Sequence, residues 1–183
     1  MPSESSAGPE RVLETRRVYE GRIVNLRVDT VALPDGRSAQ REVAEHAPVV
    51  VIVPLDEDGY VLLVRQYRLP VRQLLLELPA GGIDPGESVE EAVQRELQEE
   101  TGRRAERLER LAGFYASPGY CDELMHLYLA TELEPSPLDA DSDESIEVVR
   151  MPLADALALV ERGEICDAKT IIGLWAAARR IGE

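Results

Sequence analysis

The hydrophobic and polar positions along the chain predict a layered domain of strands and helices. The run at 49–53, Val-Val-Val-Ile-Val, is continuously β-branched, which is typical of a central strand buried on both faces. Strands separated by single helices indicate an α/β fold with a mixed sheet. The predicted strands lie at 23–33, 38–44, 49–53, 60–67, 74–78, 108–116, 124–130 and 146–151, and the predicted helices at 88–102, 153–162 and 168–181.

One helix has well-marked ends. Ser88 followed by Glu91 forms the pattern of a capping box, and Gly102 is a typical helix stop. A glycine-rich segment, residues 80–87, precedes the helix and is predicted to be a loop. Its pattern Gly81-x-x-x-x-Gly86 is superficially like a phosphate-binding loop. However, Glu87 occupies the place where such loops carry lysine, so this loop would attract phosphate only through a metal ion.

The apolar face of this helix holds two carboxylates. At about 100° per residue, Glu96 and Glu100 fall near the middle of that face, and Glu99 falls at its edge beside Arg95. Burying an unpaired carboxylate costs several kcal/mol or forces its protonation, so we expect a positive partner for this inward pair. Oxygen ligands one turn apart suit Mg²⁺ or Mn²⁺. A solvated face is the commoner interpretation of a Glu pair, but the inward phase argues against it. The apolar face comprises Val89, Ala92, Val93 and Leu97.

Composition narrows the classes of partner. The 183 residues, 44% of them hydrophobic, suffice for one compact domain. A formal charge of −15 disfavours nucleic acid and anionic membranes, and a phosphorylated substrate would need bound cations or a local arginine cluster. Cys121 and Cys166 are isolated, and the chain shows neither a signal core nor an apolar run long enough to span a membrane. We therefore expect a cytoplasmic protein.

The spacing of these residues resembles the signature box of the Nudix hydrolases. Gly81, Glu87 and the run Arg95-Glu96-Leu97-Gln98-Glu99-Glu100-Thr101-Gly102 match it over 23 residues, with Arg103 in place of an aliphatic residue. The resemblance implies an α/β/α sandwich with a mixed sheet and hydrolysis of a nucleoside diphosphate linked to another group. It also implies roughly two or three Mg²⁺ or Mn²⁺ ions held by Glu96, Glu100 and the Ala80 carbonyl. Arg95 would hold Glu99, and Glu87 would support the loop or bind a further ion.

Segments outside the box are similar to the ADP-ribose pyrophosphatase branch of this family. Pro118, 16 residues after Gly102, matches a distinguishing proline of that branch, although Pro-Gly also forms ordinary turns. The strand ending at Arg68 would supply a guanidinium for the diphosphate, the alternative being a solvated edge. By the same resemblance, substrate contacts would come from Arg41, Glu42, Gly82, Ser117, Pro118, Gly119 and Glu123.

The acidic segment 132–144 offers a candidate general base. Its Asp139-x-Asp141-x-Asp143 pattern fails as a calcium loop because Glu144 replaces the required glycine. In related pyrophosphatases a glutamate of this loop activates water or binds an ion, and Glu144 matches it best. Glu99 is the competing base, and a merely solvated charge run is the alternative for the other acids. The predicted reaction converts ADP-ribose to AMP and ribose 5-phosphate.

Residues 1–46 are expected to form a tail and a small β region, and residues 47–183 the hydrolase domain. The first strands are too few to form a core alone, so by resemblance they would pack against a second subunit in a homodimer. Two alternatives stay open. The substrate could instead be a nucleotide sugar such as GDP-mannose, or NADH. A non-catalytic ligand sensor is disfavoured, because Glu96, Glu99 and Glu100 are all present and no basic region remains for a DNA-binding domain.

Overall fold

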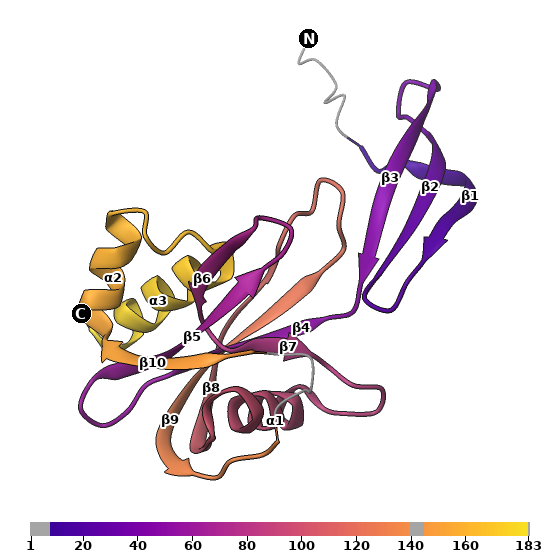
Figure 1. Cartoon of the computed structure of the whole chain (residues 1–183). Coiled ribbons are helices and arrows are strands. Elements are labelled where there is room, and N and C mark those ends of the chain that lie inside the picture. The colour runs from indigo at the N-terminus through magenta and orange to yellow at the C-terminus, as the bar shows by residue number, and fades with distance from the viewer. Residues whose placement is uncertain (1–7, 140–144, 183) are drawn as a thin grey trace. The chain divides into compact units, whose positions relative to one another are not determined.

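The computed structural model describes residues 8–139 and 145–182, in which the chain forms ten strands and three helices (Figure 1). The chain divides into two compact units. The first contains the described part of Met1–Ala47 together with Tyr115–Glu123, and the second contains Pro48–Phe114 and Leu124–Glu183. The elements are β1 (Arg11–Glu20), β2 (Val24–Ala32), β3 (Ser38–His46), β4 (Val49–Pro54), β5 (Tyr60–Arg68), β6 (Gln73–Glu77), β7 (Ala80–Gly82), α1 (Val89–Thr101), β8 (Arg103–Tyr115), β9 (Leu124–Pro135), β10 (Glu147–Pro152), α2 (Leu153–Glu161) and α3 (Ala168–Ile181).

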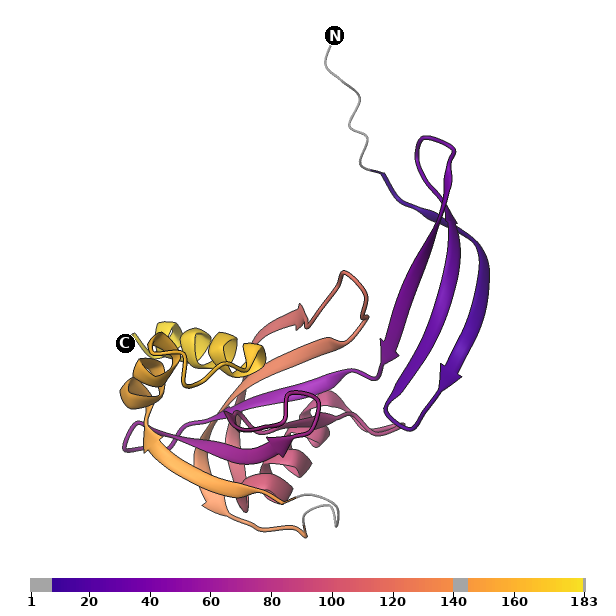
Figure 2. The same ribbon diagram turned by 45° about the horizontal axis from the view of Figure 1, so that its top comes forward.

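The predicted central strand is the middle of the second unit. β4 pairs parallel with β9 and antiparallel with β7, in a sheet of order β7-β4-β9-β8, and all six of its residues are buried. Val50 and Ile52 pack against α1, whereas Val53 faces the close approach of α3 at Gly173. Figure 2 shows the two helices on opposite sides of the sheet. Alternate residues of the strand therefore meet helices on opposite faces, which explains its unbroken apolar run. This mixed sheet between helices confirms the predicted sandwich.

A second sheet of the same unit has the order β10-β5-β6, with both pairings antiparallel. β5 ends at Arg68, and β6 returns to end at Glu77, which lies opposite Val64. From there the chain passes through Leu78 and Pro79 directly into β7. The short connection places the end of one sheet beside the glycine segment of the other.

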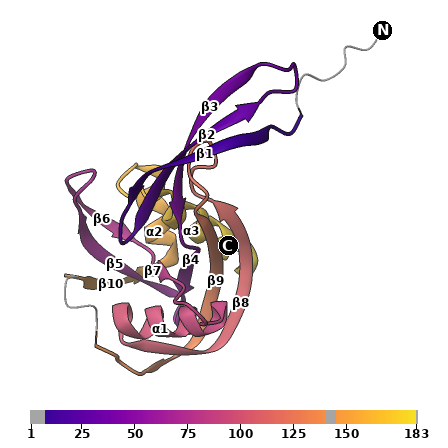
Figure 3. The ribbon, with the colours of Figure 1, turned by 90° about the vertical axis from the view of Figure 1, so that its right-hand side faces the viewer.

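The first unit has little core of its own. Its strands form an antiparallel sheet, β1-β2-β3 (Figure 3), in which β1 is exposed along its whole length. Among the described residues of this unit, Val31 and Asp29 alone are buried. The segment Tyr115–Glu123 joins this unit through Ala44, whose N–H donates to the Tyr120 carbonyl at 2.7 Å.

Three elements differ from the predicted ones. Ala80–Gly82, predicted as loop, is strand β7, because Ala80 and Gly82 pair with Val51 and Val49 of β4. Pairing with a buried neighbour overrides the weak strand preference of glycine. β8 begins at Arg103, immediately after the helix stop, rather than at residue 108. β1 begins at Arg11, before the first predicted strand at 23–33.

Candidate metal centre

The helix that carries the candidate residues has the predicted ends. Ser88 is the N-cap: its Oγ accepts from the Glu91 N–H at 3.3 Å, and the Glu91 carboxylate accepts from the Ser88 N–H at 2.8 Å. Gly102 closes the helix at φ 69°, a left-handed conformation that glycine adopts without steric cost. The capping box and the glycine stop therefore lie at the predicted ends of α1.

Glu96 and Glu100 are buried, as their place on the helix predicts, with exposed fractions of 9% and 5%. Glu100 accepts a hydrogen bond from the Ala80 N–H at 3.1 Å. The Glu96 carboxylate lies against Gly81, where a Cβ would overlap all three of its terminal atoms. Both carboxylates are thus placed against the backbone of β7.

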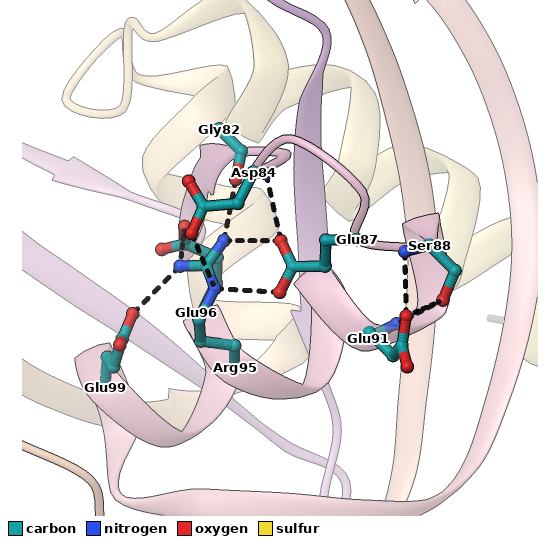
Figure 4. Close-up of polar contacts among 8 residues, drawn as sticks. All are labelled: Gly82, Asp84, Glu87, Ser88, Glu91, Arg95, Glu96 and Glu99. Carbon is teal, nitrogen blue, oxygen red and sulfur yellow. Dashed lines mark hydrogen bonds and ion pairs between the residues drawn. The ribbon is translucent and has the colours of Figure 1, made fainter.

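Arg95 links the glycine segment to the helix (Figure 4). Its guanidinium donates to both oxygens of Glu87 at 2.9 Å and to the Gly82 carbonyl at 2.8 Å. It also donates to Glu96 at 2.7 Å and to the edge residue Glu99 at 3.0 Å. The hydrogen bonds from Arg95 lower the pKa of Glu87, and those to Glu87 and Glu96 raise the pKa of Arg95. Glu87 also accepts from the N–H of Asp84 at 3.0 Å, so it ties the loop to the helix.

The charges and donor atoms of this cluster fit a hard divalent cation. Glu87, Glu96 and Glu99 all accept from the one guanidinium of Arg95, so the carboxylates around it outnumber it. In residues 8–139 and 145–182, no three His, Cys, Asp or Glu side chains converge as a ready-made cage. Mg²⁺ does not require one, because it commonly takes one or two carboxylates and completes its shell with water and substrate oxygens. Glu96, Glu100 and a backbone carbonyl of β7 match that pattern.

A second ionic cluster lies beside β7. Arg68 donates from Nε and Nη2 to the two oxygens of Glu77, both at 2.8 Å, and the charge of Glu100 is among those that raise the pKa of Arg68, after the dominant hydrogen bond to Glu77. Lys169 also donates to Glu77, whose exposed fraction is only 1%. The sequence pattern singled out Arg68 but missed Glu77 and Lys169. Two features of the sequence could have pointed to them: Glu77 is a glutamate within the apolar run 74–78, and Lys169 is the one lysine of the chain.

The remaining predicted residues, apart from Glu144, lie in the first unit. Arg41 is exposed and donates to both oxygens of Glu10, at 3.0 and 2.5 Å, and Glu42 is exposed. The Ser117 carbonyl accepts from the Cys121 N–H at 2.9 Å, so Ser117, Pro118 and Gly119 form a tight turn. Glu123 lies 3.6 Å from His46 Nδ1. Glu144 is outside the described residues.

None of the helices in the described part of the chain combines the length and apolar character needed to cross a membrane.

Known proteins resemble this chain over most of its length. The model of the NUDIX domain matches residues 39–172, and that of the nucleoside diphosphate sugar hydrolase N-terminal domain matches residues 10–44. An ADP-ribose pyrophosphatase of Bacillus subtilis (strain 168) is 38% identical over 88% of each chain. A GDP-mannose pyrophosphatase of Yersinia pestis (strain Pestoides F) is 37% identical over 75% of each. The crystal structure of an ADP compounds hydrolase superposes with a TM-score of 0.88 at 28% identity, covering 98% of this chain and 97% of that one. These matches and the carboxylate-bearing helix show that the chain belongs to the Nudix hydrolase family.

Proposed function

We propose that this Nudix hydrolase cleaves the pyrophosphate bond of ADP-ribose to give AMP and ribose 5-phosphate. The observation that carries the proposal is the buried pair Glu96 and Glu100, set against β7 in a cluster with excess negative charge. The choice of ADP-ribose is supported by the 38% identity to the Bacillus subtilis ADP-ribose pyrophosphatase. Within the more general class, the substrate is a nucleoside diphosphate derivative.

Glu96, Glu100 and the Ala80 carbonyl would hold roughly two or three Mg²⁺ or Mn²⁺ ions. When bound, these ions supply the positive charge that neutralises a diphosphate and acidifies an attacking water. Proton transfer and substrate binding are carried out by side chains of the protein itself. Glu99, or Glu144 beyond the described residues, takes the proton of the water that attacks one phosphorus in line.

The arginines have separate tasks in this proposal. Arg95 fixes Glu99 and Glu87 through charge-assisted hydrogen bonds and thereby keeps the loop and the helix in register. Arg68 binds the diphosphate, for which a planar guanidinium fork is well suited. Substrate contacts beyond the diphosphate are assigned to Arg41, Glu42, Gly82, Ser117, Pro118, Gly119 and Glu123.

The proposed site is tested by Glu96→Gln and Glu100→Gln, each assayed with ADP-ribose and Mg²⁺. We expect kcat to fall by about 100-fold or more in each variant, because the negative charge that binds the ion is lost while the shape of the side chain is kept. Circular dichroism and thermal unfolding check that the variants are folded. Near-normal turnover in both would exclude the metal assignment.

The substrate is tested by a panel of ADP-ribose, GDP-mannose and NADH, compared by kcat/KM. Preferential cleavage of ADP-ribose is the expected result. A higher kcat/KM for GDP-mannose or NADH would overturn the choice of substrate but not the site.

We also propose that residues 1–46 serve dimerisation and that residues 47–183 are the hydrolase domain. The exposed strand β1 supports this, because its apolar side chains have no core to enter within their own unit. Those side chains are Val12, Leu13, Val18 and Tyr19. Analytical ultracentrifugation at micromolar concentration should give the mass of a homodimer, and a monomer there would refute the proposal.

A further inference from the structure

The chain has one lysine, and that lysine is buried. All other basic residues, 19 of the 20, are arginine, yet Lys169 in the first turn of α3 has an exposed fraction of 7%. Lysine is among the residues least often buried unless it is paired. Its position therefore requires a partner that offsets the cost of removing an ammonium group from water.

The partner is Glu77, the most deeply buried carboxylate among the described residues. Lys169 Nζ donates to Oε2 of Glu77 and, at 3.0 Å, to Oδ2 of Asp167. The same Oε2 of Glu77 also accepts from Nη2 of Arg68, while Oε1 accepts from Nε of Arg68. Burial alone would raise the pKa of Glu77, but Arg68 and Lys169 together keep it below its ordinary value. Glu77 is thus an ionised group held between two cations.

The geometry explains why this position carries lysine in an arginine-rich chain. The planar fork of Arg68 already spans both oxygens of Glu77, so a second guanidinium would compete for the same plane. An ammonium group is compact and needs only the lone pair left on one oxygen. Lys169 takes that lone pair from the side of α3, whereas the Arg68 side chain, with an exposed fraction of 40%, reaches solvent.

The charge balance of the cluster depends on Lys169. Arg68 and Lys169 carry two positive charges against the two negative charges of Glu77 and Asp167. Without Lys169 the cluster would carry a net charge of −1, and the Arg68 guanidinium alone would have to neutralise a carboxylate buried beneath it. Less of its positive potential would then be available to a diphosphate arriving from solvent.

We propose that Lys169 is a positioning residue. It fixes Glu77, and through Glu77 it keeps the Arg68 guanidinium oriented, with its positive charge available to the diphosphate of the substrate. The inference rests on the proposed function, in which Arg68 binds that diphosphate. Lys169 itself touches neither substrate nor metal in this scheme.

The test is Lys169→Met, which keeps much of the length of the side chain and removes its charge. Calorimetric titration with inorganic pyrophosphate in the presence of Mg²⁺ should show binding weakened about tenfold, the order of effect of one charge-assisted contact. With the diphosphate compound that the wild type hydrolyses best, KM should rise by about the same factor while kcat changes about twofold or less, because substrate and transition state lose the contact alike.

Leu174→Ala is the matched control, because Leu174 is fully buried on the same helix and its truncation loosens α3 without removing a charge. We expect it to lower the unfolding temperature but leave pyrophosphate binding and KM at wild-type values. Equal weakening in both variants, or no weakening in Lys169→Met, would overturn the inference.

If Lys169→Met does not fold, the double variant Glu77→Gln with Lys169→Met replaces it, since removing both partners leaves no unpaired buried charge. In this variant no buried carboxylate draws on the charge of Arg68, so only the orientation of its guanidinium is tested. Losing the Glu77 carboxylate that orients it should weaken pyrophosphate binding about tenfold, and wild-type binding would refute the positioning role. Arg68→Ala distinguishes a failure of the proposed role of Arg68 from a failure of the inference about Lys169. If Arg68→Ala binds pyrophosphate normally, the proposed role of Arg68 fails; if it binds weakly and the Lys169 variants do not, only the inference about Lys169 fails.

Discussion

Replacing Gly81 by alanine should damage the metal site while leaving the fold nearly intact. The φ of Gly81 is not in the left-handed region, so its backbone accepts alanine. The new methyl group would overlap the carboxylate of Glu96, which is the end of a flexible side chain and can move. The substitution therefore tests the position of one carboxylate rather than the stability of a core.

The size of the effect follows from the contacts of Glu96. A carboxylate displaced by about 1 Å is expected to cost about 100-fold in rate, and weakened coordination about 10- to 100-fold in metal affinity. The displacement also breaks the hydrogen bond from Arg95 to Glu96. Because the Arg95 side chain is partly exposed, the free energy of unfolding should fall by only about 1 kcal/mol. For a chain of this length that lowers Tm by about 2–4 °C.

Titration with Mn²⁺, followed by calorimetry, measures the affinity, and activity against Mg²⁺ concentration measures the consequence. Gly82→Ala is the control for folding and metal affinity, because a Cβ at Gly82 meets no atom within 4 Å. If Gly81→Ala binds Mn²⁺ as tightly as the wild type does, Glu96 is not a ligand and the reasoning fails.

Two further predictions concern α1 and its loop. The hydrogen bonds from Arg95 hold the pKa of Glu87 below its ordinary value of 4.5, so Glu87 stabilises the fold above about pH 4.5 and this contribution is lost as the pH falls through its depressed pKa. Glu87→Gln should therefore lose less stability than the wild type between about pH 5 and pH 3, measured by urea unfolding, and parallel pH curves would contradict this. Ser88→Ala removes the N-cap and should lower the free energy of unfolding by about 1 kcal/mol without changing kcat, since the cap lies about two helical turns before Glu96. A large loss of kcat would give Ser88 a role beyond capping.

Features of the site that depend on neighbouring residues along the chain were predictable from the sequence. The capping box at Ser88, the stop at Gly102 and the inward phase of Glu96 and Glu100 depend on residues within one helix, and all are confirmed. The central strand 49–53 was predictable for the same reason, because an unbroken β-branched run has few other uses.

The parts that depend on distant pairing were not predictable. β7 exists because Ala80–Gly82 pairs with β4, and no property of two glycines indicates that. Glu77 and Lys169 are 92 residues apart, so no periodicity relates them. The grouping of Tyr115–Glu123 with the N-terminal strands likewise depends on contacts with Ala44.

Because Lys169 is buried, cleavage at this residue can be used to measure local unfolding of the protein. A protease that cuts only after lysine has a single target bond in the whole chain, and that bond lies in the first turn of α3. The protease cannot seat this side chain until the first turn of α3 has opened. With enough protease to cut the open form before it recloses, the rate at which two fragments appear therefore measures the opening of this turn, without a dye or an engineered label.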